Sequence, residues 1–372
     1  MIRSERDELM DITAPQTQVE GEDVATLSHE RAVTTPEVSL IIPTHDRRER
    51  LRMVLAALEH QTVAAELYEV LIICDHCSDE TAEMCRAFAA EYRLRVFEQA
   101  PDLRGPAAAR NLGVREAAAA IILFIDDDVV PEATLIAEHL RTHREDERAV
   151  VIGPLLAPPD FRMQPWTRWE AETLAKQYRD MTDGKWEPTP RQFYTGNASV
   201  RREYILAAGG FDASFGRAED VELAYRFRDQ QLTFHFSPAA KGWHHARRPL
   251  RSWLNIATAY GEADVIMYRN GRRMTLDSMA KEFHWRHRAI QRVARLAVGR
   301  PYLSGPLVAL LLTIAFLANL LRRARVAGAC YSAIFNLRYY SRVSHELGGR
   351  RAFWKLVDGA RPAPAAEAPQ PA

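Results

Sequence analysis

Between residues 38 and 125 the sequence alternates four times between a short apolar run and a longer amphipathic stretch. The apolar runs have the length and composition of strands buried on both faces: residues 38–43, 70–74, 94–98 and 121–125. The stretches between them have helical periodicity: residues 48–60, 80–92 and 107–118. This alternation predicts an α/β fold with a doubly wound, mostly parallel sheet and helices on both faces.

The fourth apolar run ends in three consecutive carboxylates, Asp126, Asp127 and Asp128. Three adjacent charges cannot enter a core without counter-charges, so they lie at the carboxyl end of the strand. Open α/β sheets bind ligands at that edge, and carboxylate oxygens there suit Mg²⁺ or Mn²⁺ holding a phosphate. Taken alone, the same cluster could simply cap the strand and open a turn.

Acidic residues also follow the first two strands, with Asp46 after the first and Asp75 and Asp79 after the second. Such a crevice repels a phosphorylated ligand unless a metal intervenes, which favours a metal-bridged nucleotide. Residues 44–48 contain no glycine. This absence argues against a dinucleotide site of the Rossmann type and against a phosphate-binding P-loop.

The formal net charge of the 372 residues is zero, yet the charges are unevenly distributed. Residues 241–361 contain 22 Lys and Arg against 6 Asp and Glu. The aromatic pattern of a nucleic-acid binder does not accompany this excess, so no nucleic-acid partner is expected. The basic region is predicted to face a membrane surface or an anionic ligand.

Residues 303–321 contain no charged side chain and are bounded by Arg300 on one side and Arg322 and Arg323 on the other. Nineteen helical residues are just long enough to span a bilayer core. We expect membrane contact through residues 301–340, either spanning or interfacial, with a buried soluble helix as the alternative.

Four cysteines argue against a disulfide scaffold and favour a reducing compartment. Cys74 and Cys77 have C-x-x-C spacing, but neither a second ligand pair nor a thioredoxin-like context accompanies them. Residues 1–36 are polar without an apolar core of a signal sequence, and residues 357–372 are rich in Ala and Pro. Both ends are predicted to be disordered.

Several short motifs follow one another in a recognisable order and spacing. They are PTHDR (43–47), DHCSDET (75–81), GPAAARNLG (105–113), FIDDD (124–128), TGNASVRR (195–202), GGFDASF (209–215) and EDVELAYR (219–226). The set resembles the family 2 glycosyltransferases of the glycosyltransferase A fold, over roughly residues 37–250. The resemblance implies a fold like that of nucleotide-diphospho-sugar transferases and an inverting transfer.

Several donor-binding residues are implied by this resemblance. Pro43 and Thr44 correspond to the backbone that frames the nucleotide base, and Asp75 to the aspartate that hydrogen-bonds it. Arg110 and Asn111 correspond to the loop behind the donor. The family usually has two aspartates and a glycine after its second strand, and the departure at residues 74–77 puts the shape of the base pocket in doubt.

The metal site is implied at the D-x-D element. Asp126 and Asp128 match its outer positions, with Asp128 the best candidate for direct ligation, and Asp127 matches the middle position beside the donor. His244 stands where the family often has a histidine that completes a metal shell. The alternative for His244 is an ordinary surface pair with His245.

The pair Glu219–Asp220 bears most directly on mechanism. An inverting transfer needs a base for the acceptor hydroxyl, and the apolar pattern that follows places Asp220 near a helix start, where the macrodipole keeps it ionised. By resemblance Asp220 is the base and Glu219 orients a substrate, although both could merely cap the helix. Gly196 and Asn197 are expected beneath the sugar, with the amide reading hydroxyls.

Together these features predict a metal-dependent inverting glycosyltransferase that uses a nucleotide-diphospho-sugar and a glycan or lipid-linked acceptor. It would act in cell-surface glycan, polysaccharide or glycolipid synthesis, at the cytoplasmic face of a bacterial-type inner membrane. Alternatives are a non-catalytic nucleotide-sugar-binding subunit and a sugar nucleotidyltransferase, which typically needs a glycine-rich loop. The predicted divisions are a catalytic domain (37–250), a basic helical region (251–300) and membrane-associated helices (301–356).

Overall fold

The computed structural model describes residues 35–272 and 274–360. Most of the two predicted disordered ends, residues 1–34 and 361–372, lies outside the described residues. One correction concerns the carboxyl-terminal tail, which was expected to begin at residue 357. Helix α13 (Arg350–Gly359) continues to Gly359, because Phe353 and Val357 on its inner face are fully buried.

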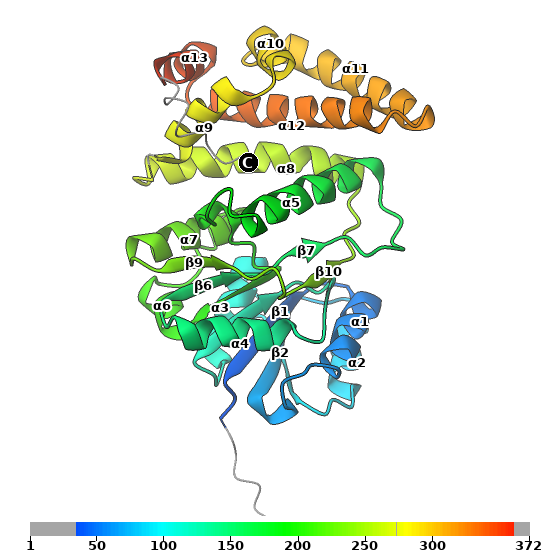
Figure 1. Cartoon of the computed structure of the whole chain (residues 1–372), viewed down its shortest axis with the longest axis vertical. Helices are drawn as coiled ribbons and strands as arrows, with labels where there is room; N and C mark the ends of the chain where they lie inside the picture. The colour runs from blue at the N-terminus through cyan, green and yellow to red at the C-terminus, as the bar shows by residue number, and fades with distance from the viewer. Residues whose placement is uncertain (1–34, 273, 361–372) are drawn as a thin grey trace, which may run out of the picture. The chain divides into compact units, whose positions relative to one another are not determined.

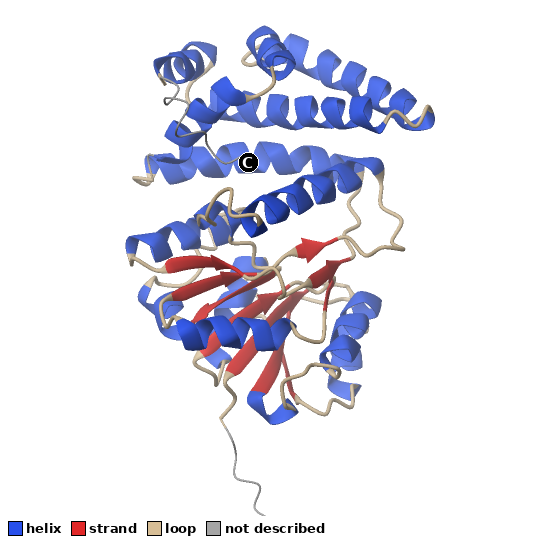
Figure 2. Ribbon diagram, in the orientation of Figure 1, coloured by secondary structure: helices blue, strands red, loops and turns tan. Residues whose placement is uncertain are grey.

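A seven-stranded sheet forms the centre of the predicted catalytic domain (Figures 1 and 2). Its order is β3 (Arg93–Glu98), β2 (Tyr68–Cys74), β1 (Val38–Thr44), β4 (Ile121–Ile125), β8 (Asn197–Arg201), β6 (Ala149–Ile152) and β9 (Thr233–Phe236). Strand β8 is antiparallel to both of its neighbours, and the other pairs are parallel. The predicted doubly wound, mostly parallel sheet is confirmed.

Helices cover both faces of this sheet, as Figure 2 shows. One core cluster contains residues of α1 (Arg48–Leu58), α2 (Thr81–Ala87) and α4 (Leu135–Glu145). The opposite cluster contains residues of α3 (Pro106–Glu116), α6 (Arg202–Ala207) and α7 (Glu219–Asp229). Within β1, Leu40 and Ile42 belong to the first cluster and Ile41 to the second. Because side chains alternate along a strand, a continuous apolar run fills both layers.

Helix α2 is shorter than the predicted span of residues 80–92. It ends at Ala87, and Phe88 takes an extended backbone conformation with φ −71° and ψ 119°. Phe88 packs against the same core cluster as α1 and α2. Burial of this aromatic ring therefore outweighs the helical propensity of the following alanines.

A small second sheet brings a distant segment to the end of β4. It pairs β5 (Val129–Pro131) with β10 (Gly242–His244), which also pairs with β7 (Leu155–Leu156). His244 lies opposite Val129, so the register carries its side chain to the neighbourhood of Asp128.

The remaining helices stack beyond the sheet in Figure 1. They are α5 (Pro165–Thr182), α8 (Leu250–Arg269), α9 (Met274–Trp285), α10 (Arg288–Ala297), α11 (Pro301–Leu320) and α12 (Ala324–Glu346). Aromatic contacts join three of them, because Trp253 on α8 lies 5.8 Å from Trp169 on α5 and 5.7 Å from Tyr331 on α12 between ring centroids. The predicted domain divisions at residues 250 and 300 stay predictions.

Two buried histidines of α4 are held by the sheet beneath them. Ser199 Oγ lies 2.8 Å from His139 Nδ1 and 2.8 Å from His143 Nε2. Burial lowers the pKa of His139 from 6.5 to about 4. Burial, followed by the neighbouring titratable groups His139 and Arg201, lowers the pKa of His143 to about 3. Both imidazoles are therefore neutral in the folded protein near pH 7.

We expect this pair to make the fold sensitive to acid. A folded-state pKa below the unfolded value gives stability that is present above about pH 6.5 and is lost as the pH falls toward the folded values. At pH 5 the loss is about 2 kcal/mol per imidazole. Urea unfolding at pH 7 and pH 5 measures it, and His143→Gln should flatten the dependence. The exposed His60→Gln is the matched control, and equal pH slopes for both variants would contradict the expectation.

Candidate active site

The carboxylates predicted to converge lie where β1, β2 and β4 end. Thr44, the last residue of β1, donates a hydrogen bond of 2.8 Å from Oγ1 to Asp127 Oδ2. Pro43 precedes it and is partly buried. Burial, followed by the charge of Asp128, raises the pKa of Asp127 to about 7. The Asp127 side chain, the middle one of the three carboxylates, is therefore hydrogen-bonded to the end of β1.

Asp75 lies at the end of β2, where its carboxylate is held from two sides. Gln99 Nε2 donates to Asp75 Oδ1 at 2.7 Å, and the backbone N–H of Gly105 donates to Oδ2 at 2.9 Å. The carbonyl of Asp75 lies 2.6 Å from His45 Nδ1. This fixed carboxylate still has lone pairs available, as the predicted contact with a nucleotide base requires.

The buried Arg110 side chain forms ion pairs with two of the predicted site carboxylates. Its Nη1 donates to Glu219 Oε1 at 2.7 Å, and its Nη2 donates to Asp126 Oδ1 at 3.2 Å. The Arg110 and Glu219 side chains are only 6% and 9% exposed, whereas that of Asp126 is 38% exposed. Burial alone would lower the pKa of Arg110, but the charges of Asp126, Glu219 and Asp220 outweigh it and raise the pKa.

Gly196 permits Asp126 to occupy this position. A Cβ atom added to Gly196 would lie 2.9 Å from Asp126 Oδ2, which is closer than side-chain atoms normally approach a carboxylate. The backbone N–H of Asp126 also donates to the carbonyl of Gly196 at 3.4 Å. The missing side chain at Gly196 therefore leaves room for the Asp126 carboxylate, and the expected place of Gly196 beneath the sugar stays a prediction.

Asp128 faces away from Arg110, toward β10 and α1. His244 Nε2 lies 3.4 Å from Asp128 Oδ1, and Arg50 Nη1 lies 3.5 Å from Oδ2. Burial would raise the pKa of Asp128, but the hydrogen bond and charge of His244 and the charge of Arg50 leave the pKa lowered. Asp128 is consequently a carboxylate at neutral pH.

Glu219 and Asp220 occupy the first turn of α7, as predicted. Ala218, just before the helix, has φ 63° and ψ 23°, a left-handed conformation that costs a non-glycine residue energy. Asp220 Oδ1 accepts from the N–H of Val221 at 2.8 Å, and Oδ2 accepts from the N–H of Thr195 at 3.5 Å. Burial, followed by the charge of Glu219, raises the pKa of Asp220 well above its ordinary value of 3.8.

Two predicted donor-binding amides have structural partners instead. Asn197 is fully buried: its amide nitrogen donates to the carbonyls of Pro154 and Ala240, and its Oδ1 lies 3.0 Å from His139 Nε2. Asn111 forms two 2.8 Å hydrogen bonds with the backbone of Phe211. The expectation that Asn197 reads sugar hydroxyls is corrected, because both ends of its amide bind the protein interior. Asn111 likewise anchors the loop at residues 209–211.

The chemistry of Asp128 and His244 fits a divalent cation. A carboxylate oxygen and an imidazole nitrogen 3.4 Å apart suit Mn²⁺, whereas Mg²⁺ prefers oxygen ligands alone. The predicted trio with Asp126 does not form a group with all ligand atoms within 4.8 Å among the described residues, because Asp126 is drawn toward Arg110. Asp126 retains its second oxygen, which is free of Arg110.

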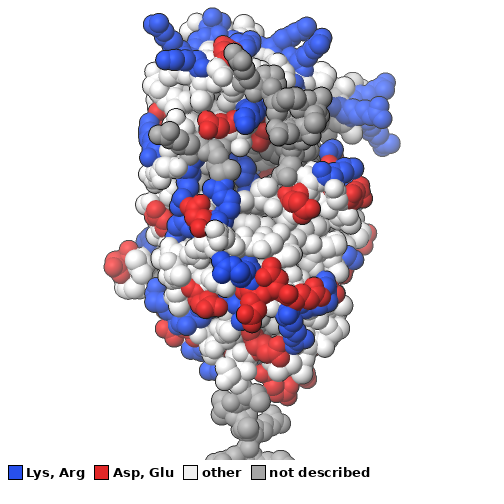
Figure 3. Space-filling view, turned by 60° about the vertical axis from the view of Figure 1, so that its left-hand side comes forward, with Lys and Arg blue, Asp and Glu red and all other residues white. Residues whose placement is uncertain are grey.

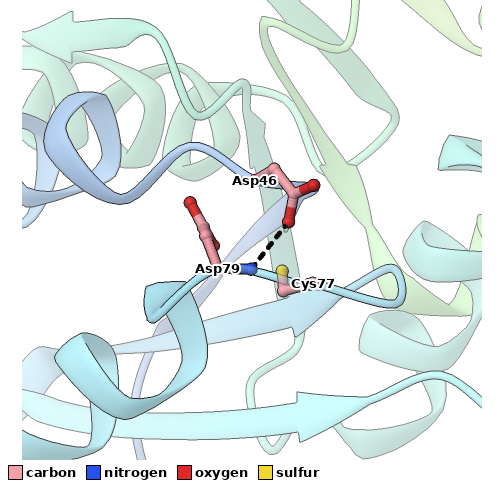
Figure 4. A group of neighbouring side chains, drawn as sticks. All are labelled: Asp46, Cys77 and Asp79. Atoms are coloured by element: carbon pink, nitrogen blue, oxygen red, sulfur yellow. Dashed lines mark hydrogen bonds between the residues drawn. The ribbon is translucent and has the colours of Figure 1, made fainter.

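One three-residue group among the described residues does meet that distance, namely Asp46, Cys77 and Asp79 (Figure 4). Asp46 Oδ1 accepts from the backbone N–H groups of Ser78 and Asp79 at 2.6 and 3.2 Å. These bonds pin the loop after β2 to the loop after β1. The hydrogen bonds of Asp46 thus explain why the three side chains of this group lie close together. All four cysteines are free.

Sequence reasoning missed three residues of this site. Arg50 on α1 reaches Asp128, and Arg217, just before α7, lies with its guanidinium 5.3 Å from the ring centroid of Tyr260. The basic run at residues 47–50 directly after β1 was the available signal for Arg50. Tyr260 is on α8, 31 residues beyond the end of α7, and nothing in the local pattern indicates that contact.

The family model for "Glycosyl transferase family 2" matches residues 39–207. This stretch of the chain is similar to the family 2 glycosyl transferases. Five of the seven motifs, from PTHDR (43–47) to TGNASVRR (195–202), fall within this range. The matched residues thus include the carboxylates at the strand ends, whereas Glu219, Asp220 and His244 follow them in the chain.

Two curated relatives illustrate how far the likeness extends. The chain is 27% identical over 245 residues to the uncharacterized glycosyltransferase YfnE of Bacillus subtilis, covering 53% of this chain and 62% of the relative. It is 27% identical over 246 residues to the pre-mycofactocin glycosyltransferase of Mycobacterium tuberculosis, covering 64% and 49%. The matched region therefore spans about half to three fifths of these relatives.

Solved structures share the fold of the family 2 domain and of much of the helical region. A mannosyltransferase from Pyrobaculum calidifontis, in complex with GDP-Man and Mn²⁺, has a TM-score of 0.53 at 18% identity, covering 83% of this chain and 87% of that one. S. aureus TarS 1–349 in complex with UDP-GlcNAc has a TM-score of 0.52 at 16% identity, covering 84% and 92%. The predicted glycosyltransferase A fold is confirmed.

We predict that Arg110→Gln destabilises the protein by about 3–5 kcal/mol, since it leaves the buried Glu219 without its counter-charge. Adding Glu219→Gln should recover part of this loss, and urea unfolding of the two single variants and the double variant measures the coupling. Arg115→Gln, an exposed position on the same helix, should change stability by less than about 0.5 kcal/mol. Strictly additive losses would contradict a direct Arg110–Glu219 interaction.

Proposed function

We propose that this chain is a metal-dependent inverting glycosyltransferase, which moves a sugar from a nucleotide-diphosphate donor to an acceptor hydroxyl. The observation that carries the proposal is Asp220. It is a carboxylate with a raised pKa at the first turn of α7, one residue from Glu219, which Arg110 connects to the D-x-D carboxylate Asp126. The Arg110 guanidinium thus connects the start of α7, which carries the proposed base, to the sheet edge proposed to bind the donor.

The chemistry assigned to Asp220 is removal of the acceptor proton. As the acceptor oxygen attacks the anomeric carbon, the bond to the diphosphate breaks on the opposite face and the hydroxyl proton passes to Asp220. A raised pKa makes the carboxylate a stronger base than an ordinary aspartate. Only the ionised form can accept the proton, so the acid limb of the pH–rate profile should lie well above pH 4.

Donor binding is assigned to the strand ends. Asp75 would accept a hydrogen bond from the nucleotide base, with Pro43 and Thr44 beside it. Asp128 and His244, with the free oxygen of Asp126, would hold the divalent cation, and Arg50 adds a positive charge 3.5 Å from Asp128. When bound, the cation neutralises the charge of the departing diphosphate.

The acceptor is proposed to be a glycan or a lipid-linked molecule at the cytoplasmic face of a membrane, in the synthesis of surface glycan, polysaccharide or glycolipid. Support comes from α11, the one helix among the described residues that is long and apolar enough to cross a bilayer. Arginines flank this helix at both ends.

We predict that Asp220→Asn lowers transfer by at least three orders of magnitude while donor binding changes less than about threefold, because the amide cannot accept the proton. Transfer is measured as release of nucleoside diphosphate in the presence of Mn²⁺ and acceptor, and binding by calorimetry. Glu203→Gln, an exposed carboxylate-to-amide change on α6, is the control and should retain full activity. Undiminished transfer in Asp220→Asn would sink the assignment of the base.

We also predict that a nucleotide-sugar donor stabilises the protein against heat in the presence of Mn²⁺ and loses most of this effect without it. Asp128→Ala should weaken the Mn²⁺-dependent binding at least tenfold, because it removes a ligand that is ionised at neutral pH. A thermal-shift screen of nucleotide-sugars measures both effects. Asp277→Ala, an exposed aspartate on α9, is the control. Equal shifts with and without Mn²⁺ would rule out metal dependence.

A further inference from the structure

Helix α11 forms the outermost layer of the helical region. Figure 1 gives the order of layers away from the sheet as α5, α8, α12 and then α11, and α11 packs along α12. On its inner side, Ala315 and Ala318 are buried against α12. Leu303 and Leu307 pack into the neighbouring cluster that contains α9 and α13. The other side of α11 has no covering element among the described residues.

The uncovered side of α11 is apolar along its length. Large apolar side chains are exposed there by 37–71%: Tyr302, Leu310, Ile314, Phe316, Leu317 and Leu320. Thr313 is the polar exception, and its hydroxyl is already bonded to the carbonyl of Ala309 at 3.0 Å. Leu321 and Val326 extend the surface into the turn that follows. A contiguous apolar surface of this extent on a folded protein indicates a site of interaction.

The charges around this surface have one sign. No Asp or Glu occurs between residues 283 and 345, whereas ten arginines do. Arg322, Arg323 and Arg325 are exposed at the turn between α11 and α12, and no ion pair holds them among the described residues. Figure 3 shows Lys and Arg side chains gathered over the helical end, at the top of the view. A lipid surface with anionic headgroups is complementary to an apolar helix side flanked by arginines.

The packing of α12 limits how α11 can contact a lipid surface. Along α12, Gly328 approaches Trp169 of α5, Arg338 Nε donates to the carbonyl of Leu254 at 3.0 Å, and Arg342 pairs with Glu262 of α8 at 2.9 Å. Helix α12 is thus fastened to the body of the protein over most of its length. Because α11 runs back along α12, it cannot cross a bilayer unless it leaves α12 or takes α8 and α12 with it.

Here we infer that α11 lies in the plane of the membrane, half inserted into one anionic leaflet, and does not span the bilayer. This inference rests on the proposed action at a membrane and deepens it. The apolar side of α11 enters the acyl boundary, and the arginines at the turn lie at the headgroups. The catalytic crevice, on the other side of α8 and α12, remains in water.

Vesicle binding tests the partner. The full chain should sediment with vesicles of phosphatidylcholine and phosphatidylglycerol (7:3), and bind vesicles of phosphatidylcholine alone at least tenfold more weakly. The double change Leu310→Glu/Leu317→Glu should reduce binding at least tenfold, whereas Leu206→Glu, an equally exposed leucine on α6, should not. Replacing Arg322, Arg323 and Arg325 by Gln should cost roughly fivefold per arginine. Equal binding by all variants would overturn the inference.

Labelling at the turn tests the orientation. With protein added to sealed vesicles, a thiol placed by Leu321→Cys should react with a membrane-impermeant maleimide from outside, above the background of the native cysteines. A spanning helix would place this residue in the lumen, where it would react only after detergent. Lumenal protection would overturn the in-plane geometry. Donor hydrolysis, assayed separately in Leu310→Glu/Leu317→Glu, would distinguish failure of the proposed activity from failure of membrane binding.

Discussion

The candidate site depends on the two ion pairs of the buried Arg110 side chain. The Arg110 guanidinium lies between Asp126, at the end of β4, and Glu219, at the start of α7, and so joins two segments more than ninety residues apart. A buried guanidinium needs carboxylate partners to offset its loss of hydration, and two neighbouring carboxylates need a positive charge to offset their repulsion. Ala218, with its left-handed backbone, directly precedes this ion pair, and the next carboxylate, Asp220, accepts from the N–H of Thr195.

A second buried ion pair ties the helical region to the same site. Arg191, a few residues before Thr195, donates two hydrogen bonds to Asp264 of α8 at 3.2 and 3.1 Å. The hydroxyl of Tyr339 on α12 donates to the same carboxylate. The loop beside Asp220 is therefore fixed by residues of α8 and α12. Helix α12, along which α11 packs, and the loop before Thr195 are thus joined through the Asp264 carboxylate.

Much of the fold followed from local pattern. The four apolar runs became β1 to β4, and the three carboxylates lie at the edge predicted for them, because burial on both faces allows only one place for adjacent charges. The boundary errors have physical causes as well. Helix α2 stops early because Phe88 turns into the core, and α13 continues to Gly359 because Phe353 and Val357 bury its inner face. Periodicity does not report such tertiary packing.

The sequence by itself determined the resemblance to family 2 glycosyltransferases, the sheet and the polar residues at its edge, because strand ends and helix starts are local properties. Only the tertiary structure decided which of those residues face the crevice. Asn197 was drawn into a buried network with His139, while Arg50 and Tyr260 joined the site from elements whose approach no local pattern encodes. It also decided that α11 lies along α12, since nineteen uncharged residues fit a spanning helix and an in-plane helix equally well until α12 is seen fastened to α8.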